Sequence, residues 1–159
     1  MKSSAFTLIE TLIVISITAI LLGFGFAGYR QYSQRQVLFA AARSVKSDLR
    51  SLQEKAMSGA KEPDVVTSCA GKFLDGYRFD IISTTQYRMS ALCSGSVVDI
   101  QDKSVELGFT IAATVNPILF KVLSQGTNIP SGSSSVVTLT QTATLKTIQI
   151  SVSAEGSIK

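Results

Sequence analysis

The sequence predicts an α+β protein in which one long N-terminal helix packs against an antiparallel β-sheet domain. Three observations predict this fold class. The first part of the chain has helical periodicity and contains no proline before Pro63. After Pro63, short runs alternate apolar and polar residues with a period of two, as half-buried strands do. Turn-forming residues divide these runs every eight to twelve residues or so, a spacing typical of a sheet or a small sandwich.

The composition excludes several classes of function. The chain has 159 residues, a net charge of +4 and no histidine. Without histidine it lacks the usual general base, the commonest metal ligand and every Ser–His or Cys–His nucleophile arrangement. The two cysteines, Cys69 and Cys93, have neither CxxC nor zinc-ligand spacing. We therefore expect no enzymatic activity, no catalytic residue, no metal and no cofactor.

The first helical segment, residues 6–29, is apolar on all sides. From Thr11 to Tyr29 there is no charged residue, and this run of about 19 residues is long enough to cross a bilayer as a helix. A five-residue leader, "MKSSA" (1–5), precedes the segment, and the polar, basic stretch "RQYSQRQ" follows it. The pattern predicts a transmembrane helix over residues 6–29.

The second helical segment, residues 30–60, is amphipathic. Apolar residues recur at alternating intervals of four and three and so share one helix face: Leu38, Ala42, Val45, Leu49, Leu52 and Ala56. Gly59 is a natural helix stop, and Pro63 follows closely. Together the two segments predict one helix from residue 6 to about residue 58, with a length of about 80 Å.

The remaining residues, 61–159, predict the β domain. The strand-like runs lie at 77–83, 86–93, 104–111, 118–124, 136–140 and 145–153. Thr84 and Thr85 separate the first two runs and predict a hairpin turn. Asp99 and Asp102 predict a polar turn, because two carboxylates are too few for a calcium site.

One acidic residue lies inside the apolar segment. The stretch "AFTLIETLIVISITAILL" (5–22) is nearly all apolar apart from Glu10. A charged side chain at the centre of a bilayer costs roughly 2.5–3.5 kcal/mol even on lenient scales. Glu10 is therefore expected to have a function.

The residues around Glu10 carry a family resemblance. A short basic leader ends in the small residue Ala5 and is followed by Phe6-Thr7-Leu8-Ile9-Glu10 and a long apolar run. This arrangement resembles the N-terminal signature of type IV pilins and type II secretion pseudopilins, in which the residue before Phe is usually Gly. The resemblance covers residues 1 to about 30.

The resemblance implies a pilin-like structural subunit. It implies that prepilin peptidase cleaves between Ala5 and Phe6 and that the new amine of Phe6 is methylated. It also implies that Glu10 meets this amine on a neighbouring subunit, so that Glu10 sets the register of assembly. The implied partners are other pilin or pseudopilin subunits, prepilin peptidase, the assembly platform of the inner membrane and the lipid bilayer.

The implied location follows from the same resemblance. The subunit would first cross the inner membrane once, with its C-terminal domain outside, and would then enter a type IV pilus or a type II secretion pseudopilus. Three alternatives stay open. Glu10 could reach the membrane interface or be protonated, residues 1–27 could be an ordinary secretory signal that is cleaved before Gly28, and the apolar segment could be a plain membrane anchor.

The later sequence is similar to the H-type pseudopilins, in "ARSVKSDLRSLQEKAM", "ILFKVLSQGT" and "IQISVSAEGSI". This similarity implies a minor subunit near the tip of a filament. Some such relatives take up DNA through arginines that follow a C-terminal glycine, whereas here Ser157, Ile158 and Lys159 follow Gly156. DNA is therefore the less favoured partner.

A basic stripe on the predicted helix is a second feature that could bind DNA. Arg43, Lys46 and Arg50 share one helix face and could track phosphates. No aromatic side chains accompany them, as binding to a single strand would require. An ordinary solvated helix surface explains the stripe better.

On the topology of a pilin, Cys69 and Cys93 lie outside the membrane, where disulfides persist. Cys93 ends the second strand of the predicted hairpin, and the residue facing it is expected near Gly76, a few residues from Cys69. A bridge would stabilise the domain by roughly 3 kcal/mol in the chain-entropy model. The alternative is two unpaired buried thiols.

Overall fold

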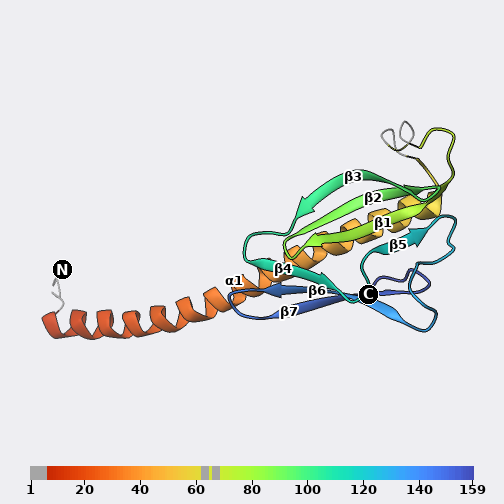
Figure 1. The fold of residues 1–159 in the computed structure, drawn as a ribbon. Helices are drawn as coiled ribbons and strands as arrows, with labels where there is room; N and C mark the ends of the chain where they lie inside the picture. The colour runs from red at the N-terminus through yellow and green to blue at the C-terminus, as the bar shows by residue number, and fades with distance from the viewer. Residues whose placement is uncertain (1–6, 62–64, 66–68) are drawn as a thin grey trace. The chain divides into compact units, whose positions relative to one another are not determined.

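The computed structural model describes residues 7–61, 65 and 69–159. Contacts within the chain divide it into two compact units, Met1–Val37 and Leu38–Lys159. Among the described residues, one helix, α1, is followed by seven strands, β1–β7 (Figure 1). Every strand pair is antiparallel. The α+β fold class predicted from the sequence is confirmed.

The helix α1 spans Leu8–Ser58. The prediction of one helix from residue 6 to about residue 58 is confirmed from Leu8 onward, and Phe6 lies outside the described residues. Gly59 ends the helix with φ of 62°, and its N–H donates to the carbonyl oxygen of Ala56 at 3.2 Å. This left-handed conformation costs glycine little, which explains why the helix stops there.

The amphipathic stripe of α1 is buried within the unit Leu38–Lys159. Its six apolar residues are each at most 7% exposed: Leu38, Ala42, Val45, Leu49, Leu52 and Ala56. Most of them belong to one apolar core with strand residues such as Tyr77, Phe79 and Val137. Burial of each large apolar side chain contributes about 1.5–3 kcal/mol. The periodicity therefore identified the face of α1 that holds this unit together.

The first sheet contains four strands in the order β3-β2-β1-β5. Their bounds are Leu74–Ser83 for β1, Gln86–Cys93 for β2, Ser96–Ser104 for β3 and Ile118–Lys121 for β5. Thr84 and Thr85 connect β1 to β2, so the predicted hairpin is confirmed. Tyr77, Phe79 and Ile118 point from this sheet into the core.

The second sheet contains three strands in the order β4-β6-β7. Their bounds are Phe109–Ala113 for β4, Ser134–Gln141 for β6 and Thr147–Ser153 for β7. The N–H of Ile111 on β4 donates to the carbonyl oxygen of Thr84 at 2.8 Å, which joins this sheet to the β1–β2 turn. Along β6, Ser135, Val137 and Leu139 are buried at alternate positions, as expected for a strand with one covered face.

The prediction of a polar turn at Asp99 and Asp102 was wrong, because both residues lie in strand β3. Arg88 on β2 forms ion pairs with both carboxylates, at 2.8 Å to Asp99. Acidic residues are depleted in strands, but the Arg88 guanidinium on the neighbouring strand neutralises the carboxylates of Asp99 and Asp102. Arg88 also lowers the pKa of the Asp102 carboxyl, chiefly through its hydrogen bond.

The predicted strand 104–111 was also wrong in its bounds. Strand β3 ends at Ser104 and β4 begins at Phe109, so residues 105–108 connect two different sheets. Gly108 has φ of 89° in this connection, a value that excludes a regular strand. The predicted strand 118–124 is shorter for the same reason, because Leu123 and Ser124 have φ of 53° and 60°.

The predicted disulfide between Cys69 and Cys93 is confirmed. The two Cα atoms lie 5.9 Å apart, and both residues are fully buried. The residue that faces Cys93 is Leu74, and Gly76 faces Leu92 instead. Register irregularities between Leu74 and Gly76 and between Ile81 and Ser83 each insert one extra residue on β1, and together they explain the offset of two positions.

A polar cluster attaches α1 to the first sheet. The carboxylate of Asp48 on α1 accepts a hydrogen bond from the Tyr87 hydroxyl at 2.6 Å and pairs with the Lys103 ammonium at 2.7 Å. The side chain of Asp48 is only 13% exposed. Because an unpaired carboxylate is costly in such a place, the cluster favours one position of the helix on β2 and β3.

This cluster gives the fold a dependence on alkaline pH. Burial, followed by the hydrogen bond to Asp48 and its charge, raises the pKa of Tyr87 above the ordinary value of about 10. The folded state therefore holds the phenolic proton more tightly than the unfolded state does. The resulting stability is complete below about pH 10 and is lost as the pH rises further.

We expect Tyr87→Phe to reduce this alkaline loss of stability. The variant also gives up one hydrogen bond, so it should be less stable at pH 8 by about 1 kcal/mol. Melting of the full chain in detergent from pH 8 to pH 11, for the parent and the variant, measures both effects. Parallel pH profiles for the two proteins would contradict the assignment to Tyr87.

Candidate functional site

The first turn of α1 places the acid of the apolar segment. Thr7 precedes the helix, and the N–H of Glu10 donates to the Thr7 carbonyl oxygen at 3.1 Å and to its Oγ1 at 3.4 Å. Thr7 is thus the N-cap and Glu10 the third helical residue, the spacing of a capping box. Sequence reasoning missed this local role, although the signal, Thr-x-x-Glu before an apolar run, is present.

Glu10 is suited to the start of a helix. A carboxylate near the N-terminus of a helix interacts favourably with the helix dipole. The side chain of Glu10 is exposed, and among the described residues no ion-pair partner meets its carboxylate. The dipole supports the charge but does not neutralise it. A cation from elsewhere can therefore bind there.

The surface around Glu10 is apolar. In the described part of residues 8–29, the large apolar side chains are all more than half exposed: Leu8, Ile9, Leu12, Ile13, Val14, Ile15, Ile17, Ile20, Leu21, Leu22 and Phe26. Contiguous apolar surface of this kind marks a protein–protein or membrane contact. Among the described residues of the unit Met1–Val37, no side chains cover this surface.

The hydroxyl groups in this stretch are satisfied within the helix. Thr11, Ser16 and Thr18 donate to carbonyl oxygens three or four residues earlier, at 2.7–2.8 Å. Such bonds let hydroxyl side chains enter apolar surroundings at little cost. Within residues 8–22, Glu10 is therefore the polar side chain that still requires a partner.

The predicted cleavage and methylation positions, Ala5 and Phe6, lie outside the described residues. Their roles stay predictions from the sequence. Thr7, the first described residue, directly follows Phe6, so the capped start of α1 lies next to the predicted new N-terminus. The predicted amine and the Glu10 carboxylate would thus stand at the same end of each helix.

The predicted DNA contacts are spread over two elements of the unit Leu38–Lys159. Arg43 and Arg50 are exposed on α1, and Lys46 is half-buried. After the turn at Gly156, the N–H of Ser151 on β7 donates to the carbonyl oxygen of Lys159 at 3.2 Å. DNA binding by the basic residues of α1 or by the residues after Gly156 therefore stays a prediction. The similarity to the H-type pseudopilins also stays a prediction.

The described part of the chain holds neither a cluster of metal ligands nor a helix with the properties of a membrane span. No three His, Cys, Asp or Glu side chains gather there in a way that could hold a metal ion. No helical stretch within the described part of the chain meets the length and hydropathy that a membrane span requires.

Comparison with known families identifies the N-terminal segment. Residues 1–26 match the model of the prokaryotic N-terminal methylation motif, which is the signature of type IV pilins and pseudopilins. No curated protein and no solved structure matched the chain. The chain thus carries the pilin signature over its first 26 residues, and this signature implies a membrane-anchored subunit that prepilin peptidase processes.

Proposed function

We propose that this protein is a structural subunit of a type IV pilus or of a type II secretion pseudopilus. In this proposal prepilin peptidase removes residues 1–5, the amine of Phe6 is methylated, and the apolar part of α1 mediates polymerisation. The unit Leu38–Lys159 then forms the part of the subunit outside the membrane. The observation that carries the proposal is the methylation motif at residues 1–26, which includes Glu10.

The geometry at the start of α1 supports the role proposed for Glu10. Its carboxylate lies in the first turn and is surrounded by apolar side chains that have no partner among the described residues. A buried charge is costly until an opposite charge meets it with good geometry. Packing of helices in one axial register would bring the Phe6 amine of one subunit to the Glu10 of the next. Other registers would leave both charges buried and unpaired.

The same features support a position in the membrane before assembly. The exposed apolar surface of residues 8–22 needs lipid or other helices around it, and the in-helix hydrogen bonds of Thr11, Ser16 and Thr18 suit either environment. In this proposal the apolar segment crosses the inner membrane once. The disulfide-bonded domain lies on its outer side, where oxidising conditions favour the Cys69–Cys93 bridge.

Comparing cells with and without prepilin peptidase tests this proposal. With the peptidase, we expect a shortened chain that is recovered from membranes and from sheared filaments. Without it, we expect the unprocessed chain in membranes alone. Recovery of the unprocessed chain in filaments would contradict the proposal. A chain of the same length in cells with and without the peptidase would also contradict it.

A further inference from the structure

The exposed apolar side chains of the unit Leu38–Lys159 are gathered at its two ends. Apart from Phe39 on α1, the large ones among the described residues form two groups. The tip patch, at the end where α1 stops, contains Met57, Phe73, Val97 and Leu123, and the base patch, at the end where α1 enters this unit, contains Ile82, Leu107 and Leu145. This distribution differs from the scattered single apolar residues of an ordinary surface.

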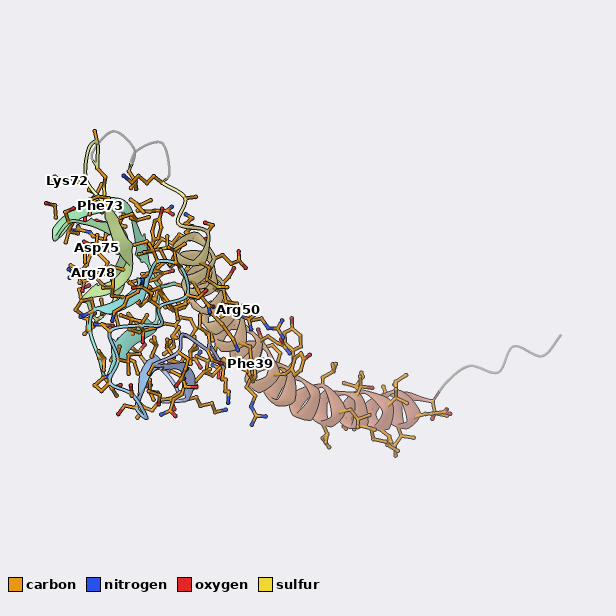
Figure 2. The ribbon with its side chains drawn as sticks, turned by 90° about the vertical axis from the view of Figure 1, so that its right-hand side faces the viewer. Phe39, Arg50, Lys72, Phe73, Asp75 and Arg78 are labelled. Atoms are coloured by element: carbon orange, nitrogen blue, oxygen red, sulfur yellow. A yellow bond between two sulfur atoms is a disulfide. The ribbon has the colours of Figure 1, made fainter. Side chains whose placement is uncertain are left out.

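Hydrogen bonds bring the members of the tip patch together. The N–H of Leu123 donates to the carbonyl oxygen of Ala56, next to Met57, at 3.1 Å. The N–H of Phe73 donates to Oγ of Ser94 at 3.2 Å, and Lys72 Nζ donates to Oγ of Ser96 at 3.1 Å. Figure 2 shows Lys72 and Phe73 together at this end of the unit.

The tip patch is also hollowed. A cleft of about 310 Å³ opens there, and Ser58, Gly59, Lys61, Lys72, Phe73 and Leu123 are among the residues that line it. Phe73 is 85% exposed, although it borders the cleft. A cleft of this volume is large enough for an aliphatic side chain.

Hydrogen bonds likewise bring the base patch together. The N–H and the hydroxyl of Thr142 both donate to the carbonyl oxygen of Gly108 at 2.9 Å, so the turn that bears Leu145 lies against the loop that bears Leu107. The N–H of Val105 donates to the carbonyl oxygen of Thr85 at 2.9 Å, which adds the β1–β2 turn and Ile82. Leu107 projects fully into solvent.

The two patches lie at opposite ends of the helical segment Leu38–Ser58, which is about 30 Å long. The tip bears the cation Lys72 beside Phe73, and the base bears the anion Glu106 beside Leu107 as well as the cation Lys146 beside Leu145. Lys72 and Glu106 are exposed and, among the described residues, neither takes part in an ion pair. One end thus offers a cleft and a cation, and the other offers aliphatic side chains and an anion.

We propose that the tip patch of one subunit binds the base patch of a second copy of this chain, with Leu107 at the cleft and Lys72 facing Glu106. A contact between two different patches is heterologous, and repetition of such a contact builds an open filament. The outer face of the first sheet carries the paired charges of Arg78, Asp80 and Arg88 and stays toward solvent. This inference rests on the proposed filament function and assigns the contact surface outside the apolar helix.

Cysteine cross-linking of the full chain tests this contact in filaments. Phe73→Cys combined with Leu107→Cys should give a ladder of disulfide-linked dimers and larger species after mild oxidation. Phe73→Cys combined with Gln149→Cys is the matched control, because Gln149 is exposed on β7 and belongs to neither patch. We expect at least about tenfold more linked chain from the first pair. Equal yields from the two pairs would overturn the inference.

A charge exchange gives a second test that does not depend on cysteine. Lys72→Glu and Glu106→Lys, each alone, should lower the recovery of the chain in sheared filaments at least about threefold, because like charges then meet. The double variant should return to the parental level. Gln149→Glu is the control and should have no effect. Failure of the double variant to recover, with both single variants impaired, would overturn the proposed pairing.

The peptidase comparison separates this inference from the proposed function. A processed chain that enters filaments but gives no ladder would refute the stacking contact alone. A chain that is never processed, yet gives the ladder, would refute the filament function and retain the contact.

Discussion

Glu10→Val is expected to enter the membrane normally and to be lost from filaments. The charge is removed from an apolar surface, so insertion should become easier. Assembly should fall at least about tenfold, because the neighbouring Phe6 amine would be buried without a partner, a cost of a few kcal/mol. Quantifying the chain in membrane and sheared-filament fractions of the same cells measures both effects.

Glu10→Gln separates assembly from helix capping. Glu10 occupies the third helical position after the Thr7 cap, where glutamine is also accepted. If charge pairing sets the register, Glu10→Gln should fail to assemble as Glu10→Val does. Thr18→Val is the matched control, since it changes a polar residue that is already satisfied within the helix. Normal assembly of Glu10→Gln would show that the charge of Glu10 does not set the register of assembly.

Removing the disulfide should have the largest effect on stability. Cys69→Ala combined with Cys93→Ala opens a loop with a sequence separation of 24, for which the chain-entropy model gives a loss of roughly 3 kcal/mol. Since 1 kcal/mol shifts the melting temperature of a domain of this size by several degrees, we expect a decrease of roughly 10 °C. Thermal unfolding of the full chain in detergent measures it.

A thiol count provides the control for this prediction. The denatured, unreduced parent should label at no cysteine, and the denatured, reduced parent at both. Two labelled cysteines without reduction would show that the bridge is absent in the native protein. An unchanged melting temperature in the double variant would show that the bridge contributes nothing to stability.

The helix and most of the strands could be predicted because their patterns are local. The four-three spacing from Leu38 to Ala56 leaves one helix face to bury, and Gly59 supplies the stop. The β1–β2 hairpin follows from alternation and from the polar pair at Thr84 and Thr85. These patterns can be recognised in the sequence without knowing which residues lie close together in the folded protein.

The features that the sequence analysis missed depend on tertiary partners. Strand β3 carries Asp99 and Asp102, and only the position of Arg88 on β2 explains why acids are tolerated there. Two extra residues on β1, one at each register irregularity, moved the partner of Cys93 from Gly76 to Leu74. Asp48, on the helix, meets Tyr87 and Lys103 from two different strands, a contact that no spacing along the chain reveals.

At the start of α1, the sequence was more informative about function than the contacts within one chain. The pentapeptide from Phe6 to Glu10 predicted the motif that the family comparison confirms at residues 1–26. The structure adds the Thr7 cap and shows that the Glu10 carboxylate has no ion-pair partner among the described residues. The cation that we propose for Glu10 belongs to another subunit, and therefore it cannot appear within a single chain.

The intact mass of the chain extracted from its native membrane tests the central claim most directly. We expect the mass of residues 6–159 with one disulfide and one added methyl group, and fragmentation should place that methyl group on the Phe6 amine. A mature chain that begins at Gly28, or one that retains Met1, would contradict the assignment to a processed pilin-like subunit.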